Sequence, residues 1–161
     1  VQDNIFFGQS EAADTDETRQ QALQLSQAAE FVDRYPEKAA HPIAQLGRNV
    51  SGGQKQRLSI ARALARRPEI LIFDDSFSAL DYKTDATLRE GLAKQLPGTT
   101  KIIVAQRIST IRHADQILVL DRGEIAGLGT HDALMASCPV YREIAMSQLS
   151  EEELKKGGAS K

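Results

Sequence analysis

The stretch ILIFDDSFSALD, residues 70–81, joins a short apolar run to three acidic residues. Residues 69–74 predict a strand that is buried on both faces, because an unbroken apolar run of this length is typical of parallel sheets. Asp74 and Asp75 stand at the end of this strand, and Asp81 follows after a polar turn. Carboxylates in such a place are costly unless a positive group meets them. We therefore expect a metal ion, a phosphate-bound metal or a helix N-terminus beside Asp74 and Asp75.

The rest of the chain changes from helical to strand-like periodicity around this stretch. Before it, residues 16–34 and 51–66 predict two helices, with apolar residues three or four positions apart and a proline after each. After it, we expect these elements in chain order: a helix at 81–95, a strand at 100–105, a short helix at 106–114, a strand at 116–121, a hairpin strand at 124–129 and helices at 131–137 and 140–149. The β-α-β-α-β order predicts an α/β fold with a parallel sheet covered by helices.

The composition of the 161-residue chain is that of a soluble globular protein, with 41% hydrophobic and 26% charged residues and a mean hydropathy of -0.35. No stretch approaches the roughly 18 apolar residues of a membrane span. The net charge of -2 and the absence of Trp argue against a nucleic-acid partner. Cys138 is the only cysteine, which excludes an internal disulfide. Because the sequence begins at Val1, we expect it to be a piece of a longer protein.

The stretch NVSGGQKQRLSIARAL, residues 49–64, places an anion-binding pattern at the start of the second predicted helix. Ser51 supplies a hydroxyl, and Gly52 and Gly53 leave the backbone N–H groups unhindered before Gln54. The N-terminus of a helix favours anions, phosphate especially. Taken alone, these four residues fit an ordinary serine N-cap equally well.

Together, these stretches resemble the nucleotide-binding domains of ABC-type ATPases. The segment VSGGQKQRLSIARAL resembles their signature motif, whose consensus begins LSGGQ, ILIFDD resembles their Walker B strand, and residues 78–81, SALD, resemble their D-loop. The resemblance covers residues 1–149 and is strongest to multidrug exporters. It implies a partial P-loop NTPase-like ABC ATPase domain of the α/β class. In it, residues 1–66 form the helical signature subdomain, residues 67–149 the C-terminal half of the core, and residues 150–161 a flexible charged tail.

The resemblance also implies roles for particular residues. Asp74 would lie just outside the direct ligands of the Mg²⁺ that bridges the ATP phosphates, and the next position, normally the Glu that acts as general base, is Asp75 here. The switch position that is normally His is Gln106, whose amide can hydrogen-bond a phosphate but cannot carry a charge or pass a proton. The remaining positions that would bind nucleotide are Ser51, Gly52, Gly53, Gln54, Ser78 and Asp81.

These two departures imply one half of a heterodimeric ABC exporter for drugs or lipids, with ATP and Mg²⁺ as cofactors. The chain's own Walker B and switch would form a degenerate ATP site, because Asp75 is one methylene shorter than Glu. Its intact signature would complete the active site of a second ABC nucleotide-binding domain. The other expected partners are the exporter's transmembrane domains, which would hold the chain at the cytoplasmic face of the plasma (inner) membrane.

One ABC motif has no match in the chain, the Walker A pattern G-x-x-x-x-G-K-[ST]. In the nearest register, from Gly47 to Gly52, Gly53 and Gln54 take the places of the Lys and the Ser or Thr. We expect this motif upstream of Val1. The 161 residues alone are therefore predicted to be inactive and to bind ATP weakly or not at all.

Two alternative functions remain open at this point. The first is a non-transport ABC ATPase of DNA repair or translation, which would be marked by coiled-coil insertions or basic patches, and the sequence shows neither. The second is a regulatory module that binds nucleotide in trans and never turns it over. Turnover measured at a single site separates slow from absent catalysis.

Overall fold

The helices and strands of the computed structural model, which describes residues 1–8 and 15–148, fall into two units. The first is Val1–Val104 and the second begins at Ala105. The boundary expected between residues 66 and 67 lies inside the first unit and stays a prediction about the ATPase domain. The tail expected at residues 150–161 lies outside the described residues.

Among residues 1–8 and 15–104, the first unit has six helical segments before its first strand and one helix between its two strands. They are α1 (Gln2–Ile5), α2 (Asp16–Leu25), α3 (Ala29–Val32), the short 3₁₀ turns η2 (Lys38–Ala40) and η3 (Gln45–Gly47), α4 (Gly52–Ala65), β1 (Ile70–Asp74), α5 (Tyr82–Gln95) and β2 (Thr100–Val104).

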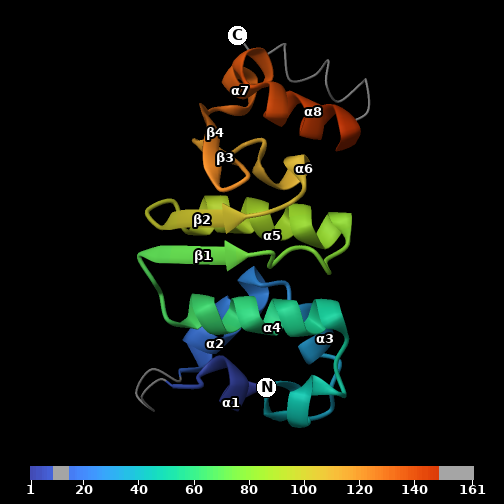
Figure 1. Ribbon diagram of the computed structural model, residues 1–161. Coiled ribbons are helices and arrows are strands. Elements are labelled where there is room, and N and C mark those ends of the chain that lie inside the picture. Colours follow the sequence, from blue (N-terminus) through green and yellow to red (C-terminus); the bar gives the residue numbers. More distant parts are fainter. Residues whose placement is uncertain (9–14, 149–161) are drawn as a thin grey trace. The chain divides into compact units, whose positions relative to one another are not determined.

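The two strands of this unit are parallel and lie side by side, with Ile70 opposite Thr100 and Asp74 opposite Val104 (Figure 1). The prediction that the first strand is buried on both faces is wrong for this structure. Leu71 and Phe73 are buried, whereas Ile70 and Ile72 are 58% and 67% exposed. The reason is that side chains alternate across a strand, and the described helices cover only one of its faces.

One apolar core joins the covered face of the sheet to the helices. Leu71 and Phe73 share it with Leu64 of α4 and with Leu88 and Leu92 of α5. The helix α4 also packs against α1 and α2, so its apolar residues are buried from several directions. This packing fixes the start of α4 and the end of β1, which carry the predicted site residues of the unit.

The single helix expected over residues 16–34 is broken in two. Between α2 and α3, Gln27 has a φ of 61°, which lies outside the helical region. The buried Ser26 hydroxyl donates to the Leu23 carbonyl and accepts from the Ala28 N–H, so it replaces hydrogen bonds of a continuous helix. The expected apolar face is nevertheless correct, because Ala28 and Val32 are buried.

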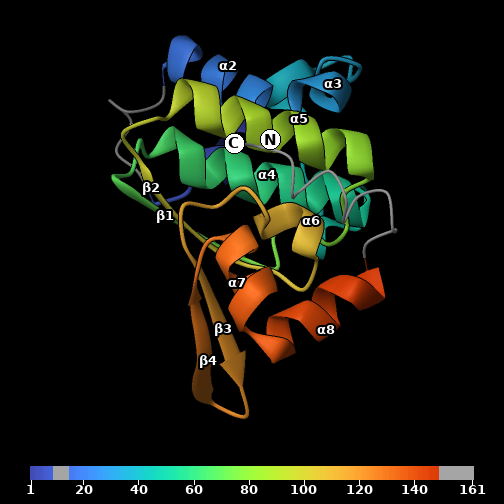
Figure 2. The same ribbon diagram turned by 90° about the horizontal axis from the view of Figure 1, so that it is seen from above.

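The second unit is a hairpin packed against helices (Figure 2). Its elements are α6 (Ile108–Ile111), β3 (Ile117–Asp121), β4 (Glu124–Gly129), α7 (His131–Ser137) and α8 (Pro139–Gln148). Its core centres on Tyr141, whose buried hydroxyl lies 2.8 Å from His131 Nδ1. Burial raises the pKa of Tyr141 and lowers that of His131.

The expectation that residues 116–121 extend the parallel sheet is wrong for this structure. The strand β3 instead pairs antiparallel with β4 in a sheet of its own. Arg122 and Gly123 both have positive φ, which gives a tight turn that sends the chain straight back along β3. The expected hairpin is therefore confirmed. None of the helices in the two described ranges is long and apolar enough to span a bilayer.

Candidate nucleotide-binding site

The start of α4 is closed by the residues that the sequence selected. Ser51 is the N-cap, and its hydroxyl accepts a hydrogen bond from the Gln54 N–H at 3.3 Å. The Gln54 side chain reciprocates, since its Oε1 accepts from the Ser51 N–H at 2.8 Å. This capping box defines where the helix begins. The positive end of the dipole of this 14-residue helix therefore lies at the exposed Ser51.

The two glycines of this turn have different surroundings. A Cβ on Gly53 would lie 3.0 Å from the carbonyl oxygen of Ala79, which is backbone and cannot swing away. A Cβ on Gly52 would meet nothing nearer than the Ala79 Cβ at 4.0 Å, an ordinary contact. Gly53 therefore permits a close approach between the helix start and residues 78–81, while Gly52 is not required for it.

The end of β1 turns sharply at the second aspartate. Asp74 and Asp75 are both exposed, and Asp75 has a φ of 48°, a left-handed conformation that Asp tolerates better than most residues. The Asp75 N–H donates to the Val104 carbonyl at 3.0 Å, which ties the turn to the end of β2. The Asp75 carbonyl accepts from the Ser78 N–H at 3.3 Å and from the Ser78 hydroxyl at 3.0 Å.

Gln56 joins the start of α4 to this turn, and sequence reasoning missed it. Its Nε2 donates to Ser78 Oγ at 3.2 Å and to the Asp75 carbonyl at 3.4 Å, and its Oε1 accepts from the Ala79 N–H at 3.0 Å. A signal was present, because Gln56 lies one helical turn before the buried Ile60 and is thus a polar residue on the buried face. The structure accordingly brings the start of α4 together with residues 75–79.

Asp81 is the N-cap of α5. Its carboxylate accepts from the Thr84 hydroxyl at 2.7 Å and from the Thr84 N–H at 3.0 Å. The hydrogen bond from the Thr84 side chain, followed by that from its backbone, lowers the pKa of Asp81. Its observed contacts are therefore those of a helix cap, and its proposed contact with nucleotide stays a prediction.

Gln106 belongs to the second unit, where it is exposed at the start of α6. Its backbone carbonyl accepts from Gln148 Nε2 at 2.8 Å, and Gln148 Oε1 accepts from the Ile108 N–H at 2.9 Å. The last residue of α8 thus holds the backbone on both sides of Arg107. Sequence reasoning did not identify Gln148, because its partners lie about 40 residues earlier in the chain.

The comparisons with known proteins agree with these features. Residues 1–78 match the family described as ABC transporter. An ABC transporter ATP-binding protein of Mycobacterium bovis is 46% identical over 149 residues, which are 92% of this chain and 25% of that protein. The chain is part of an ABC transporter ATP-binding domain. Residues 49–64 resemble the signature of this family and residues 70–81 its Walker B strand and D-loop, and the roles of their residues stay predictions.

A solved structure and two further relatives also match most of this chain. The structure of a bacterial Atm1-family ABC exporter with ATP bound matches this chain with a TM-score of 0.87 and 35% identity. The match covers 93% of this chain and 26% of the exporter chain. The ATP-dependent lipid A-core flippase of Xanthomonas oryzae is 37% identical over a region that covers 95% of this chain and 26% of the flippase. Human ATP-binding cassette sub-family B member 5 is 41% identical over a region that covers 92% of this chain and 12% of that protein. The chain thus spans about a quarter or less of the relatives it matches.

Asp74 is the residue of this chain that suits a Mg²⁺ shared with nucleotide phosphates. No group of three or more His, Cys, Asp or Glu side chains in residues 1–8 and 15–148 could hold a metal by itself. Mg²⁺ in nucleotide sites is held by one or two carboxylates, with phosphates and water as its other ligands. The exposed Asp74 carboxylate at the end of β1 fits such a shared site.

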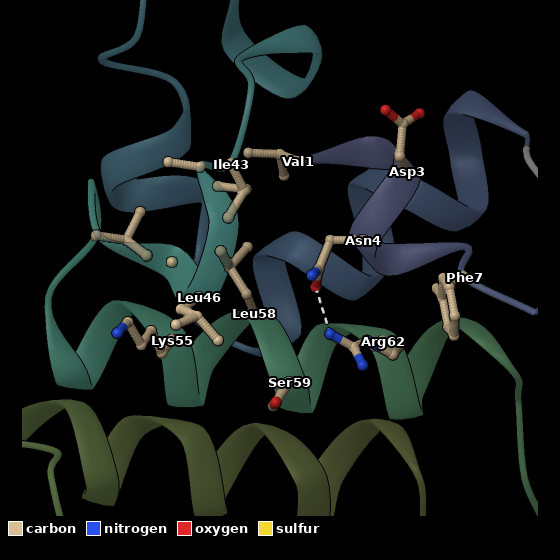
Figure 3. Close-up of a pocket in the computed structure, with 13 residues that line it drawn as sticks. Val1, Asp3, Asn4, Phe7, Ile43, Leu46, Lys55, Leu58, Ser59 and Arg62 are labelled. Carbon is tan, nitrogen blue, oxygen red and sulfur yellow. Dashed lines mark hydrogen bonds between the residues drawn. The ribbon is translucent and has the colours of Figure 1, made fainter.

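A pocket of about 460 Å³ lies beside α4 in the first unit (Figure 3). Its wall includes Leu46, Lys55 and Arg62, and the Arg62 guanidinium donates to Asn4 Oδ1 at 2.7 Å. None of the predicted site residues lines it. The pocket therefore shares Val50, Lys55 and Arg62 with the segment that resembles the signature, but it includes none of the residues predicted to bind nucleotide.

Proposed function

We propose that this chain belongs to an ATP-hydrolysing subunit of a heterodimeric ABC exporter and that its own ATP site is degenerate. The signature at Ser51–Gln54 completes the active site of a second ABC domain, where fast hydrolysis takes place. The observation that carries the proposal is the contrast within the first unit. The start of α4 has the complete signature and an intact capping box, whereas the end of β1 offers Asp75 in place of Glu.

The geometry of the Asp75 turn supports a weak general base. A general base must come within hydrogen-bond reach of the water that it activates. The Asp75 backbone is bonded to Val104, Ser78 and Gln56, so it cannot move forward to compensate for the missing methylene. A misplacement of about 1 Å costs about 10²-fold in rate. We infer that the site of this chain holds ATP longer than it hydrolyses it.

ATP and Mg²⁺ are the cofactors of the proposed site. Asp74 would hold the ion on the protein side, and the bound ion would neutralise charge on the phosphates. Gln106 would hydrogen-bond the terminal phosphate through its neutral amide and would not transfer a proton. The Walker A segment is expected outside the 161 residues. We therefore expect these residues alone to bind ATP weakly, and micromolar affinity in calorimetry would contradict this expectation.

The proposed partners are a second ABC domain and the transmembrane domains of the exporter. The relatives support exporter membership, because they include an ATP-dependent lipid A-core flippase and a structure of an ABC exporter. They also favour the exporter over an ABC ATPase of DNA repair or translation. The proposed location is the cytoplasmic face of the plasma (inner) membrane. The transported compound, drug or lipid, is set by segments other than these residues.

The test restores the usual residues in the full-length heterodimer whose partner site has been inactivated. Asp75→Glu together with Gln106→His should raise ATP turnover about 10- to 100-fold, since general-base catalysis contributes about 10²–10⁴-fold. Asp75→Asn with Gln106→His is the matched control, because it restores the switch without a carboxylate at position 75. Unchanged turnover in the Glu/His variant would contradict the degenerate site. A module that never turns nucleotide over would show no turnover before the change.

A further inference from the structure

We propose that Gln56 is a positioning residue that fixes the Walker B turn and the D-loop to the signature helix. Both polar atoms of its side-chain amide form hydrogen bonds. Nε2 donates to Ser78 Oγ and to the Asp75 carbonyl, and Oε1 accepts from the Ala79 N–H. These bonds connect residues 19 to 23 positions apart in the chain. One side chain thus spans the segment that begins with the general-base position and continues into the D-loop.

Other contacts of this turn agree with a positioning role for Gln56. Asp75 has a left-handed backbone, and such conformations persist where neighbouring groups fix them. The neighbours of the turn are Val104 from β2, Ser78 from within the turn and Gln56 from α4. Gly53 lies against the Ala79 carbonyl on the same side, so the helix approaches closely enough for the Gln56 amide to reach.

The consequence is that the signature helix and the Walker B turn of one chain are held as one piece. A displacement of the start of α4 would be transmitted through Gln56 to the backbone of Asp75 and to Ser78. The role of Gln56 is therefore to hold the acidic residue and the D-loop in place, without contact to nucleotide. The catalytic part of this inference rests on the proposed function, whereas the hydrogen-bond part does not.

The first test measures amide hydrogen exchange of Ala79 in the full-length protein. Gln56→Met removes the acceptor while keeping a long side chain, so exchange at Ala79 should become about 2- to 10-fold faster, the factor that one net hydrogen bond provides. Gln56→Glu keeps an acceptor and should preserve the protection. Gln24→Met, at an exposed position of α2, controls for the substitution itself. Unchanged exchange in Gln56→Met would overturn the inference.

The second test places Gln56→Met in the Asp75→Glu, Gln106→His background with an inactive partner site. If Gln56 positions the acid, kcat should fall about 10-fold while the KM for ATP changes less than about 2-fold. Faster Ala79 exchange with an unchanged kcat would overturn the positioning role. If the Glu/His background gains no turnover, the proposed degenerate site fails, and Ala79 exchange alone then decides the role of Gln56.

Discussion

The start of α4 and the end of β1 lie in the same unit, and they differ in how closely they follow the ABC pattern. The start of α4 has the serine, the two glycines and the glutamine of the signature, closed by a reciprocal cap. The end of β1 forms an equally well-bonded turn, but Asp75 stands where the family has Glu. The backbone of the turn is therefore intact, and the difference is that the Asp75 carboxylate reaches one methylene less far than a Glu carboxylate would. Such a site can keep its architecture and lose its rate.

The largest effect is expected from breaking the intact side of this comparison. Ser51→Arg in the full-length heterodimer places a bulky cation at the end of α4 that we propose binds phosphate, and it removes the cap. We expect ATP turnover at the partner's site to fall by about 10²-fold or more, the scale seen when a group that stabilises transition-state charge is lost. Ser147→Arg, at an exposed serine of α8, is the matched control. Equal turnover in the two variants would contradict a role for the signature in the partner's site.

A smaller effect is expected from the two neighbouring glycines. Gly53→Ala forces a Cβ to within 3.0 Å of the Ala79 carbonyl, so the helix start and the D-loop must separate. We expect a loss of about 1–3 kcal/mol in the free energy of unfolding of the complete ABC domain, measured in urea. Gly52→Ala meets only an ordinary contact at 4.0 Å and should lose far less. Equal losses would show that the approach to Ala79 is not tight.

The smallest effect concerns the carboxylate that caps α5. Hydrogen bonds from Thr84 lower the pKa of Asp81, so ionised Asp81 stabilises the folded state above its unfolded pKa of about 3.9. This stabilisation is lost as the pH falls through the lower folded pKa. The stability difference between wild type and Asp81→Asn should therefore shrink as the pH falls from about 5 to 2. Urea midpoints measure it.

The control for this acid dependence is Thr84→Val. This variant keeps the backbone N–H but removes the hydroxyl, the largest cause of the shifted pKa. The acid-dependent difference attributed to Asp81 should be reduced in this background. A difference of the same size would mean that Thr84 does not set the titration of Asp81.

The sequence was most informative where a side chain bonds its own neighbourhood. Ser51 was recognisable as a possible helix cap, and it does bond a backbone N–H three residues away. The order of strands and helices also predicted the parallel pairing of β1 with β2, and the structure confirms it. The family resemblance then assigned chemical roles that the caps alone do not carry.

The features that sequence reasoning missed depend on distant partners or on backbone choices without a periodic signal. The helix breaks because Gln27 has a left-handed backbone, but a glutamine fits a continuous helix equally well, so the sequence does not mark the break. The exposed face of β1 depends on what packs beside the strand, since Ile70 and Ile72 are as apolar as a buried pair. Gln56 and Gln148 bond groups about 20 and 40 residues away, so the helical pattern could at most mark Gln56 as a polar residue on a buried face, without identifying its partners.

The central claim is that the site containing Asp75 retains ATP while the partner's site hydrolyses it. The most direct measurement follows the nucleotide bound to the full-length heterodimer after a single mixing with stoichiometric radiolabelled ATP. We predict that one of the two bound nucleotides becomes ADP quickly and that the other remains ATP. In the Asp75→Glu, Gln106→His variant both should become ADP. Conversion of both nucleotides at the same rate in the wild-type heterodimer would contradict the claim.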